Sequence, residues 1–164
     1  MIRHKQQRKN AFSLLEVVIV VAIIAILAAI GIPRMSRGSR GAGDSALKAN
    51  LAILRNAVDL YAAEHQGAYP TDESTIAGQL TLYTNSSGTT SEIKTGAYIY
   101  GPYLRSVPPM PVGTYKGNTG FEAVGTPSIT AGWFYKASTG EISANALDTD
   151  TDDETHKYND PNYY

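Results

Sequence analysis

The sequence predicts an α+β protein in which a long N-terminal membrane-spanning helix is packed on a small head with an antiparallel β-sheet. Three observations predict this class. Residues 12–32 form an unbroken apolar run, residues 44–67 repeat apolar positions with the period of a helix, and short strand-like runs follow after residue 111. The length of 164 residues corresponds to about one domain.

The first eleven residues form a basic leader that contains Arg3, Lys5, Arg8 and Lys9 and no acid. Over the whole chain, 14 basic residues face 15 acidic ones. This balance excludes the strong basic excess typical of a nucleic-acid-binding domain. Because the chain has no cysteine, a disulfide framework, a zinc thiolate site and a cysteine nucleophile are excluded as well.

The run from Phe12 to Ile32 contains 21 residues, of which only Ser13 and Glu16 are polar. As a helix it extends about 31 Å, which matches the hydrocarbon core of a bilayer. The basic leader predicts that the N-terminus stays in the cytoplasm and that the rest of the chain lies outside. A cleaved secretory signal peptide is the alternative, but its apolar region is usually only about 7–15 residues long.

Glu16 is the one charged residue of this run. An acid at the centre of a membrane helix costs about 3 kcal/mol even on insertion scales, and such groups usually have a function. If the chain were cleaved before Phe12, the new α-amine would lie one helical turn away and could neutralise the carboxylate. The alternative is a carboxylate that reaches the lipid headgroups and interacts favourably with the helix dipole.

The string KNAFSLLEVVIVVAIIAILAAIGIPR resembles the class III signal of type IV pilins and type II secretion pseudopilins. The resemblance implies cleavage between Ala11 and Phe12 by a membrane aspartyl prepilin peptidase, which also N-methylates Phe12. It gives Glu16 and Pro33 roles in assembly, with Glu16 pairing with the N-terminal amine of a neighbouring subunit. Ala11 departs from the family pattern, which usually has glycine before the cleaved bond.

Residues 33–43 combine one proline, three glycines and three arginines, and therefore predict a basic linker that breaks the helix. The head is predicted over residues 44–146. Its helix is expected to begin near Asp44 and to end at Gly67, because apolar residues recur at spacings of four and three, at Leu47, Leu51, Leu54, Val58 and Tyr61.

The rest of the head is predicted to be a loop-rich connection over residues 72–110, followed by four strands. The strands are expected at residues 112–115, 121–124, 132–136 and 141–144, with a hairpin turn at residues 138–140. The eleven tyrosines and the single tryptophan are expected to pack the core and its rim. QGAYPTDES resembles the G-x-Y-P-T motif that follows the long helix in major pseudopilins, and GPYLRSVPPMP resembles the segment that precedes their small sheet.

The acidic tail, residues 147–164, places Asp148, Asp150 and Asp152 at alternate positions, a spacing that suits a hard cation. The later ligands of an EF-hand loop are missing. Because the resembling pseudopilins bind a structural calcium ion in a C-terminal acidic loop, the resemblance implies Asp148, Asp150, Asp152 and Asp153 as candidate ligands by region. A solvated tail without calcium is the alternative, and no other cofactor is expected.

No catalytic constellation is found, since the three histidines lie apart in the leader, at a helix end and in the tail, at His4, His65 and His156. The chain is therefore not expected to be an enzyme. The resemblance implies a structural subunit of a type II secretion pseudopilus, held in the inner membrane with a periplasmic head. Its implied partners are further copies, minor pseudopilins, the prepilin peptidase, an assembly ATPase and an inner-membrane platform. A type IV pilin and a membrane-anchored binding domain that does not polymerise are the alternatives.

Overall fold

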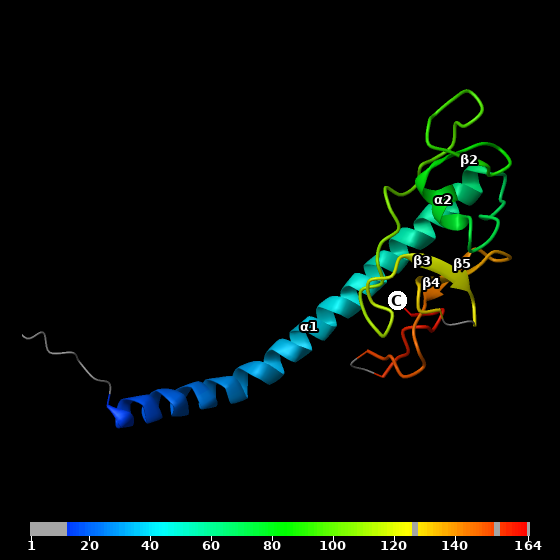
Figure 1. The fold of residues 1–164 in the computed structure, drawn as a ribbon. Helices are drawn as coiled ribbons and strands as arrows, with labels where there is room; N and C mark the ends of the chain where they lie inside the picture. Colours follow the sequence, from blue (N-terminus) through cyan, green and yellow to red (C-terminus); the bar gives the residue numbers. More distant parts are fainter. Residues whose placement is uncertain (1–12, 126–127, 153–154, 164) are drawn as a thin grey trace, which may run out of the picture. The chain divides into compact units, whose positions relative to one another are not determined.

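The computed structural model describes residues 13–125, 128–152 and 155–163, and within the helix it leaves the side chains of residues 31–39 undescribed. The chain divides into two units, with the boundary between Ser39 and Arg40. The elements, in chain order, are the helices α1 (Leu14–Glu64) and α2 (Ile76–Thr81) and the strands β1 (Tyr83–Thr84), β2 (Thr90–Ser91), β3 (Gly120–Ala123), β4 (Ala131–Lys136) and β5 (Glu141–Ala144) (Figure 1).

The expected helix break over residues 33–43 is wrong, because α1 runs without interruption through this segment. Ending one helix and starting another would leave four carbonyls and four N–H groups without helical partners, whereas each glycine costs only about 1 kcal/mol and a proline about 3 kcal/mol. At least one of the glycines has a packing role. A Cβ placed on Gly43 would come within 2.7 Å of the Val112 side chain, so glycine at this position permits the close approach of a head loop.

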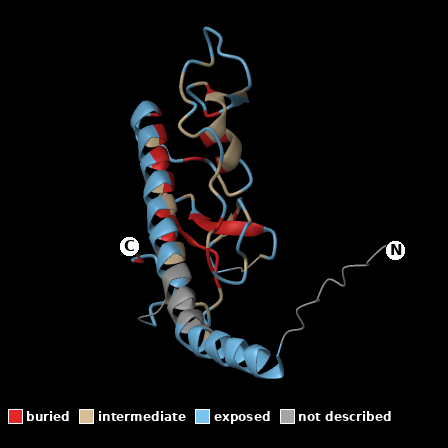
Figure 2. Cartoon of the chain, turned by 90° about the vertical axis from the view of Figure 1, so that its left-hand side faces the viewer, coloured by how far each residue is buried: buried red, intermediate tan, exposed pale blue. Residues whose placement is uncertain are grey.

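The head is organised around the predicted apolar face of α1, which the structure confirms. Leu47, Leu51, Leu54, Val58 and Tyr61 are all at most 2% exposed. They belong to one core with Ile76 and Leu80 of α2, with Trp133 and Tyr135 of β4 and with Ile142 of β5. In Figure 2 the buried residues of α1 accordingly lie on one side of the helix, while the other side is exposed. The spacing of apolar residues therefore predicted this helix and its buried face correctly.

The principal sheet has the order β3-β4-β5 and is mixed rather than antiparallel. The β4–β5 hairpin is antiparallel, as predicted, and its turn ends at Gly140, which has φ +71°. The pairing of β3 with β4, however, is parallel. Four residues of β3 span about 13 Å, and the seven connecting residues, 124–130, can reach about 23 Å, so the chain is long enough to return along β3 before β4 begins.

The strand expected over residues 112–115 is also wrong, since these residues form bends and a turn. The backbone N–H of Met110 donates to the Asn118 carbonyl over 2.8 Å, and the N–H of Gly117 donates to the Met110 carbonyl over the same distance. These bonds close the segment into a loop in which Gly113 has φ +74°. The apolar side chain of Val112 is buried in the core without belonging to a strand.

The connection over residues 72–110 contains structure that its composition did not predict, namely α2 and the two-residue ladder of β1 with β2. The Asp72 carboxylate accepts hydrogen bonds from the backbone N–H groups of Ser74 and Thr75, just before α2. Hydrogen bonds from the side chains of Ser74 and Thr75 also lower the pKa of the Asp72 carboxyl. Inside α2, the buried Gln79 amide donates to the Gly88 carbonyl and thereby holds the following loop.

The C-terminal residues 155–163 are packed onto the head, so a fully solvated tail is wrong for this segment. Tyr158 and Tyr163 are 6% and 5% exposed, and their rings form an edge-to-face pair. The Tyr158 hydroxyl donates to the Asp44 carboxylate over 2.6 Å. Arg55 of α1 donates to the carbonyls of Ile142 and Pro161, and therefore joins β5 and the C-terminal segment to the helix.

Alkaline pH is expected to destabilise the head through three tyrosines. Burial raises the pKa of Tyr103, Tyr135 and Tyr158 above the ordinary value. The carboxylate of Glu64 raises the pKa of Tyr103 further, and that of Asp44 raises the pKa of Tyr158 further. The fold therefore favours the neutral phenols, so their contribution to stability is complete below the unfolded pKa of about 10 and is lost as pH rises above it. Denaturant unfolding at pH 9 and pH 11 should show a lower midpoint at pH 11. Tyrosinate absorbance that titrates fully near pH 10 without a loss of stability would contradict this prediction.

Candidate functional site

The N-terminal unit presents the start of α1 as a candidate site. Ser13 precedes the helix, and its carbonyl accepts hydrogen bonds from the backbone N–H groups of Glu16 and Val17. Glu16 thus lies in the first turn of α1, and its side chain is exposed. A carboxylate in this position interacts favourably with the positive end of the helix dipole, by about 0.3–1 kcal/mol at an exposed site.

Apart from Glu16, the N-terminal part of α1 is apolar on every side. All its large aliphatic side chains from Leu14 to Ile30 are exposed, by between 49% and 82% of their surface. A helix with this character has no polar face to turn toward water, and such helices are normally covered by lipid or by other helices. The arrangement therefore combines a surface suited to apolar surroundings with one carboxylate at its beginning.

Several of the predicted site residues lie outside the described part of the chain. These are Ala11 and Phe12, where cleavage is expected, and the side chain of Pro33, whose backbone lies within α1. The expected span over residues 12–32 likewise includes Phe12 and the side chain of Ile32, which are not described.

Over the described residues, no helix meets the combined criteria of length and apolarity for a membrane span.

The strings QGAYPTDES and GPYLRSVPPMP form hydrogen bonds with the helices and the sheet of the head. In the first, the Pro70 carbonyl accepts a hydrogen bond from the Tyr135 hydroxyl of β4 over 2.8 Å, and the backbone N–H of Thr71 donates to the Gln79 side chain of α2. In the second, the carbonyls of Pro108 and Pro109 accept hydrogen bonds from the Trp133 indole and the Asn50 amide respectively. Both strings therefore fix the position of the sheet or of its neighbours.

His65 occupies a packed position at the end of α1 rather than an open one. It is 5% exposed, and its ring stacks on that of Tyr61 with the centroids 3.8 Å apart. Its two ring nitrogens lie 2.9 Å from the Tyr61 carbonyl and 3.0 Å from the Asn85 carbonyl. These contacts tie the helix end to the following loop.

The candidate calcium ligands are held by separate protein donors. Asp148 forms an ion pair with Lys157 at 3.2 Å and accepts a hydrogen bond from the Asn159 amide. The hydrogen bond from Asn159 is the largest single cause of a lowered pKa of the Asp148 carboxyl, and the hydrogen bond and charge of Lys157 lower it further. The Asp152 carboxylate accepts a hydrogen bond from the backbone N–H of His156 and lies 3.2 Å from its imidazole Nδ1.

Asp150 has a different set of partners from Asp148 and Asp152. Its carboxylate accepts hydrogen bonds from the backbone N–H of Leu147 and from both the N–H and the hydroxyl of Thr114. Asp153 lies outside the described residues. Within the described ranges, no group of three histidine, cysteine, aspartate or glutamate residues is arranged to hold a metal ion. The described carboxylates therefore do not fit a common coordination sphere.

Calcium is expected to change the stability of the head little. Because Asp148, Asp150 and Asp152 accept hydrogen bonds from different protein donors, an ion bound by all three would compete with those bonds. Thermal unfolding of the full chain in detergent should give the same Tm with calcium and with a chelator. A Tm raised by calcium and lowered by the chelator would instead support the calcium site that the resemblance implies.

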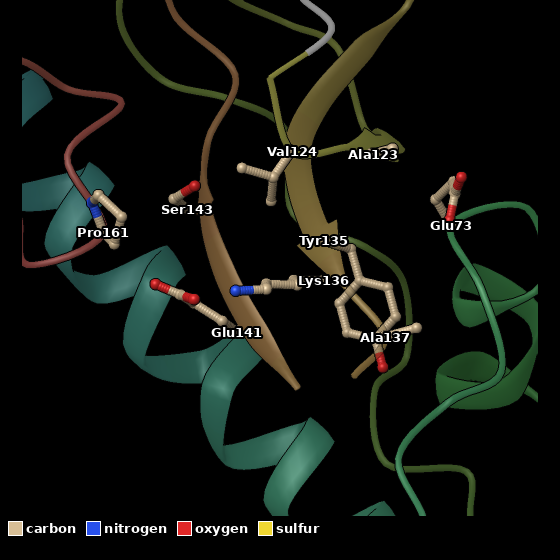
Figure 3. Close-up of a pocket in the computed structure, with 9 residues that line it drawn as sticks. All are labelled: Glu73, Ala123, Val124, Tyr135, Lys136, Ala137, Glu141, Ser143 and Pro161. Atoms are coloured by element: carbon tan, nitrogen blue, oxygen red, sulfur yellow. The ribbon is translucent and has the colours of Figure 1, made fainter. Parts of the chain in front are cut away.

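An open hollow of ≈ 530 Å³ lies beside the sheet, as Figure 3 shows. The charged groups among its described lining residues are Glu73, Lys136 and Glu141, and Lys136 and Glu141 are cross-strand partners in the hairpin. The Tyr135 hydroxyl, which belongs to another lining residue, is bonded to Pro70. Among the described lining residues, no nucleophile is paired with a general base, so the lining does not point to a catalytic site.

The sequence did not predict the contacts that attach the C-terminal segment to α1. A helix was expected to begin near Asp44, but Asp44 lies inside α1, and its carboxylate accepts a hydrogen bond from the Tyr158 hydroxyl. Lys48 lies over the Tyr163 ring, with its ammonium 5.4 Å from the ring centroid. These partners are more than one hundred residues apart, so no local pattern in the sequence could have indicated the pairs.

A comparison with known protein families gives a match at the N-terminus of the chain. Residues 6–32 match the family described as the prokaryotic N-terminal methylation motif. The matched stretch contains Ala11, Phe12 and Glu16, the residues selected from the sequence for processing and assembly. Comparisons with curated proteins and with solved structures gave no match for the chain.

Proposed function

We propose, from the premise that residues 6–32 carry the prepilin-type signal of type IV pilin-like proteins, that the chain is a structural subunit of a type II secretion pseudopilus. The observation that supports the proposal is that the matched residues overlap the beginning of α1, where Glu16 lies in the first turn of the helix. Type IV pilin-like proteins are structural rather than catalytic, and the signal implies processing by a prepilin peptidase followed by polymerisation.

In the proposed pathway the chain is inserted in the inner membrane with its leader in the cytoplasm and its head in the periplasm. The peptidase hydrolyses the amide bond between Ala11 and Phe12, which releases the leader with a new carboxylate and leaves an amine on Phe12. A methyl group from a sulfonium donor then replaces one hydrogen of that amine. Each of these steps acts on the N-terminal segment, and none requires a catalytic group in the head.

Assembly then follows from the character of the processed helix. Its apolar side chains are covered by the helices of neighbouring copies, and the Glu16 carboxylate meets the Phe12 amine of an adjacent subunit. In a low-dielectric surrounding an unpaired carboxylate costs several kcal/mol, so this pair favours the correct axial position of each incoming subunit. An assembly ATPase with its membrane platform would supply the work, and minor pseudopilins would form the tip.

A pilin of a surface pilus is the second candidate, because the same signal directs both kinds of subunit. The strings QGAYPTDES and GPYLRSVPPMP favour the pseudopilin because they resemble segments of that family. Pro70 and Thr71 of the first and Pro108 and Pro109 of the second form hydrogen bonds with other elements of the head. Deletion of the gene should therefore block export of secreted proteins. Loss of surface pili with normal secretion would favour the pilin instead.

The first test is the intact mass of the protein extracted from its native membrane, with sequencing of the N-terminal fragment. A chain that begins with N-methylated Phe12 is the expected result, and it would also establish that Ala11 is accepted before the cleaved bond. A chain that still begins at Met1, or one that begins near residue 32, would contradict the proposed pathway. The measurement needs no assumption about the secreted substrates.

A further inference from the structure

We propose that Asn85 is a site of N-linked glycosylation, at which the side-chain amide receives a saccharide from a diphosphate donor. Asn85, Ser86 and Ser87 form the one Asn-x-Ser/Thr triplet without a central proline in the sequence. This triplet is the acceptor motif for N-glycosylation, and it is modified on surface loops of exported proteins. The inference goes beyond the proposed function, because it concerns the head and requires neither cleavage of the leader nor polymerisation.

The triplet begins the turn that connects β1 with β2. The backbone N–H of Asn85 donates to the Thr89 carbonyl over 3.1 Å, and the N–H of Gly88 donates to the Asn85 carbonyl over 3.0 Å. Gly88 has φ +79°, a conformation that glycine adopts without steric cost. Asn85 is half-buried, and the side chains around it are exposed at three positions: Ser86, Ser87 and Thr89. The turn is therefore closed by its own backbone and lies at the surface of the head.

Hydrogen bonds fix the direction of the Asn85 amide. Its Oδ1 accepts from the backbone N–H groups of Ser87 and Thr89 over 3.1 and 2.9 Å, and from the Ser87 hydroxyl over 2.9 Å. The contact with the Ser87 N–H is an Asx turn. Because three donors meet at Oδ1, the amide nitrogen Nδ2 lies on the side away from them. Within the described ranges Nδ2 donates no hydrogen bond, so the atom that would carry the saccharide is available.

The contacts that hold the turn to the rest of the head leave this side chain out. The His65 ring nitrogen Nε2 lies 3.0 Å from the Asn85 carbonyl oxygen, and the Gln79 amide donates to the Gly88 carbonyl over 2.9 Å. Both contacts are made to the backbone of the turn. A saccharide on Nδ2 would therefore leave them in place.

Asn118 shows the opposite arrangement and serves as an internal comparison. Its Nδ2 donates to the carbonyls of Ile129 and Ala131 over 2.7 and 3.3 Å, so a saccharide on this nitrogen would displace at least one of these bonds. The residue two positions later is Gly120, which has no hydroxyl. Asn85 thus differs from Asn118 both in the sequence motif and in the availability of the amide nitrogen.

The Ser87 hydroxyl favours the reaction at Asn85. An amide nitrogen is a weak nucleophile because its lone pair is delocalised onto the oxygen, and donors at that oxygen stabilise the negative charge that develops as an N–H proton is lost. The nitrogen forms a bond to the anomeric carbon of the donor, and the bond from that carbon to the diphosphate oxygen breaks. The diphosphate leaves with both electrons of the broken bond, and the amide proton passes to a base of the transferase.

Peptide mass spectrometry of the protein extracted from its native membrane tests the inference directly. Trypsin releases residues 56–94 as one peptide, because Arg55 precedes it, Lys94 ends it and no other basic cleavage site lies between them. We expect this peptide to carry a saccharide mass that fragmentation assigns to Asn85. The peptide that contains Asn118 should be unmodified in the same digest.

Three variants of the full chain test the role of each side chain. Asn85→Gln and Ser87→Ala should lose the saccharide, whereas Ser87→Thr keeps the hydroxyl and should retain it. Fluorescence of the buried Trp133 during denaturant unfolding checks that each variant is folded. The natural sequence is measured in the same way, so a variant that fails to fold does not decide the outcome.

An unmodified 56–94 peptide would overturn the inference, and so would a saccharide carried by the hydroxyls of Ser86, Ser87 or Thr89 instead of the amide. The N-terminal residue of the same sample is sequenced independently. An unmodified peptide from a chain that begins with N-methylated Phe12 would overturn this inference and leave the proposed function intact. A saccharide on Asn85 of a chain that still begins at Met1 would support this inference and oppose the proposed function.

Discussion

Replacing Glu16 with glutamine is expected to abolish filament assembly while leaving processing intact. The substitution keeps the size of the side chain but removes the charge that would pair with the Phe12 amine of the neighbouring subunit. Loss of one partner from a buried ion pair costs about 3–5 kcal/mol, which corresponds to a reduction of at least about 100-fold in the association constant. Sedimentation of filaments, together with the intact mass of the membrane-bound chain, measures assembly and processing separately.

Two matched variants make this result interpretable. Glu16→Asp retains the charge on a shorter side chain and should restore part of the assembly. Glu92→Gln removes an acid from an exposed loop of the head and should assemble normally. Filaments of Glu16→Gln in normal amounts would show that the carboxylate has no role in assembly, and the alternative of a carboxylate that only reaches the headgroups would then be preferred.

Replacing Leu54 with alanine is expected to lower the free energy of unfolding of the head by about 2–5 kcal/mol. Leu54 is 0% exposed and belongs to the core formed by α1, α2 and the sheet. Removal of its side chain leaves a cavity that the surrounding core can fill only in part. Because a domain has only about 5–15 kcal/mol of stability in total, this loss is a large fraction of it.

Ile53→Ala is the matched control, since it removes a side chain of the same size from the next residue of the same helix. Ile53 is 47% exposed, so the change should alter the free energy of unfolding by no more than about 0.5 kcal/mol. Trp133 is the single tryptophan and is fully buried, so its fluorescence reports unfolding of the head in the full chain in detergent. Equal losses for the two variants would contradict the assignment of the buried face of α1.

The elements that the sequence predicted well are those whose evidence is local. The buried face of α1 was predicted from the spacing of Leu47 to Tyr61, because a helix brings residues three and four apart onto one side. The β4–β5 hairpin was predicted from two short runs separated by a turn with Gly140. The prepilin-type signal is also contiguous, and its prediction is confirmed by the match over residues 6–32.

The errors arose at features that neither composition nor the alternation of apolar residues decides. The break expected over residues 33–43 was inferred from composition, whereas the continuous helix avoids two additional unsatisfied ends. Val112 was expected in a strand, but its side chain fills the core from a loop next to Gly43. The parallel pairing of β3 with β4 depends on how the chain returns between them, and alternation of apolar residues is the same for either direction of pairing.

The sequence by itself determined the processing signal, the position of Glu16 and the amphipathic half of α1, because each of these properties depends on residues within a few turns of one helix. Only the tertiary structure decided what the acidic C-terminal segment does. Its carboxylates bond to Thr114, Lys157 and His156, while Tyr158 reaches Asp44 across the length of the chain. The physical reason is that the type of a side chain fixes which partners it can accept, whereas the fold fixes which of those partners lie within a hydrogen bond's length.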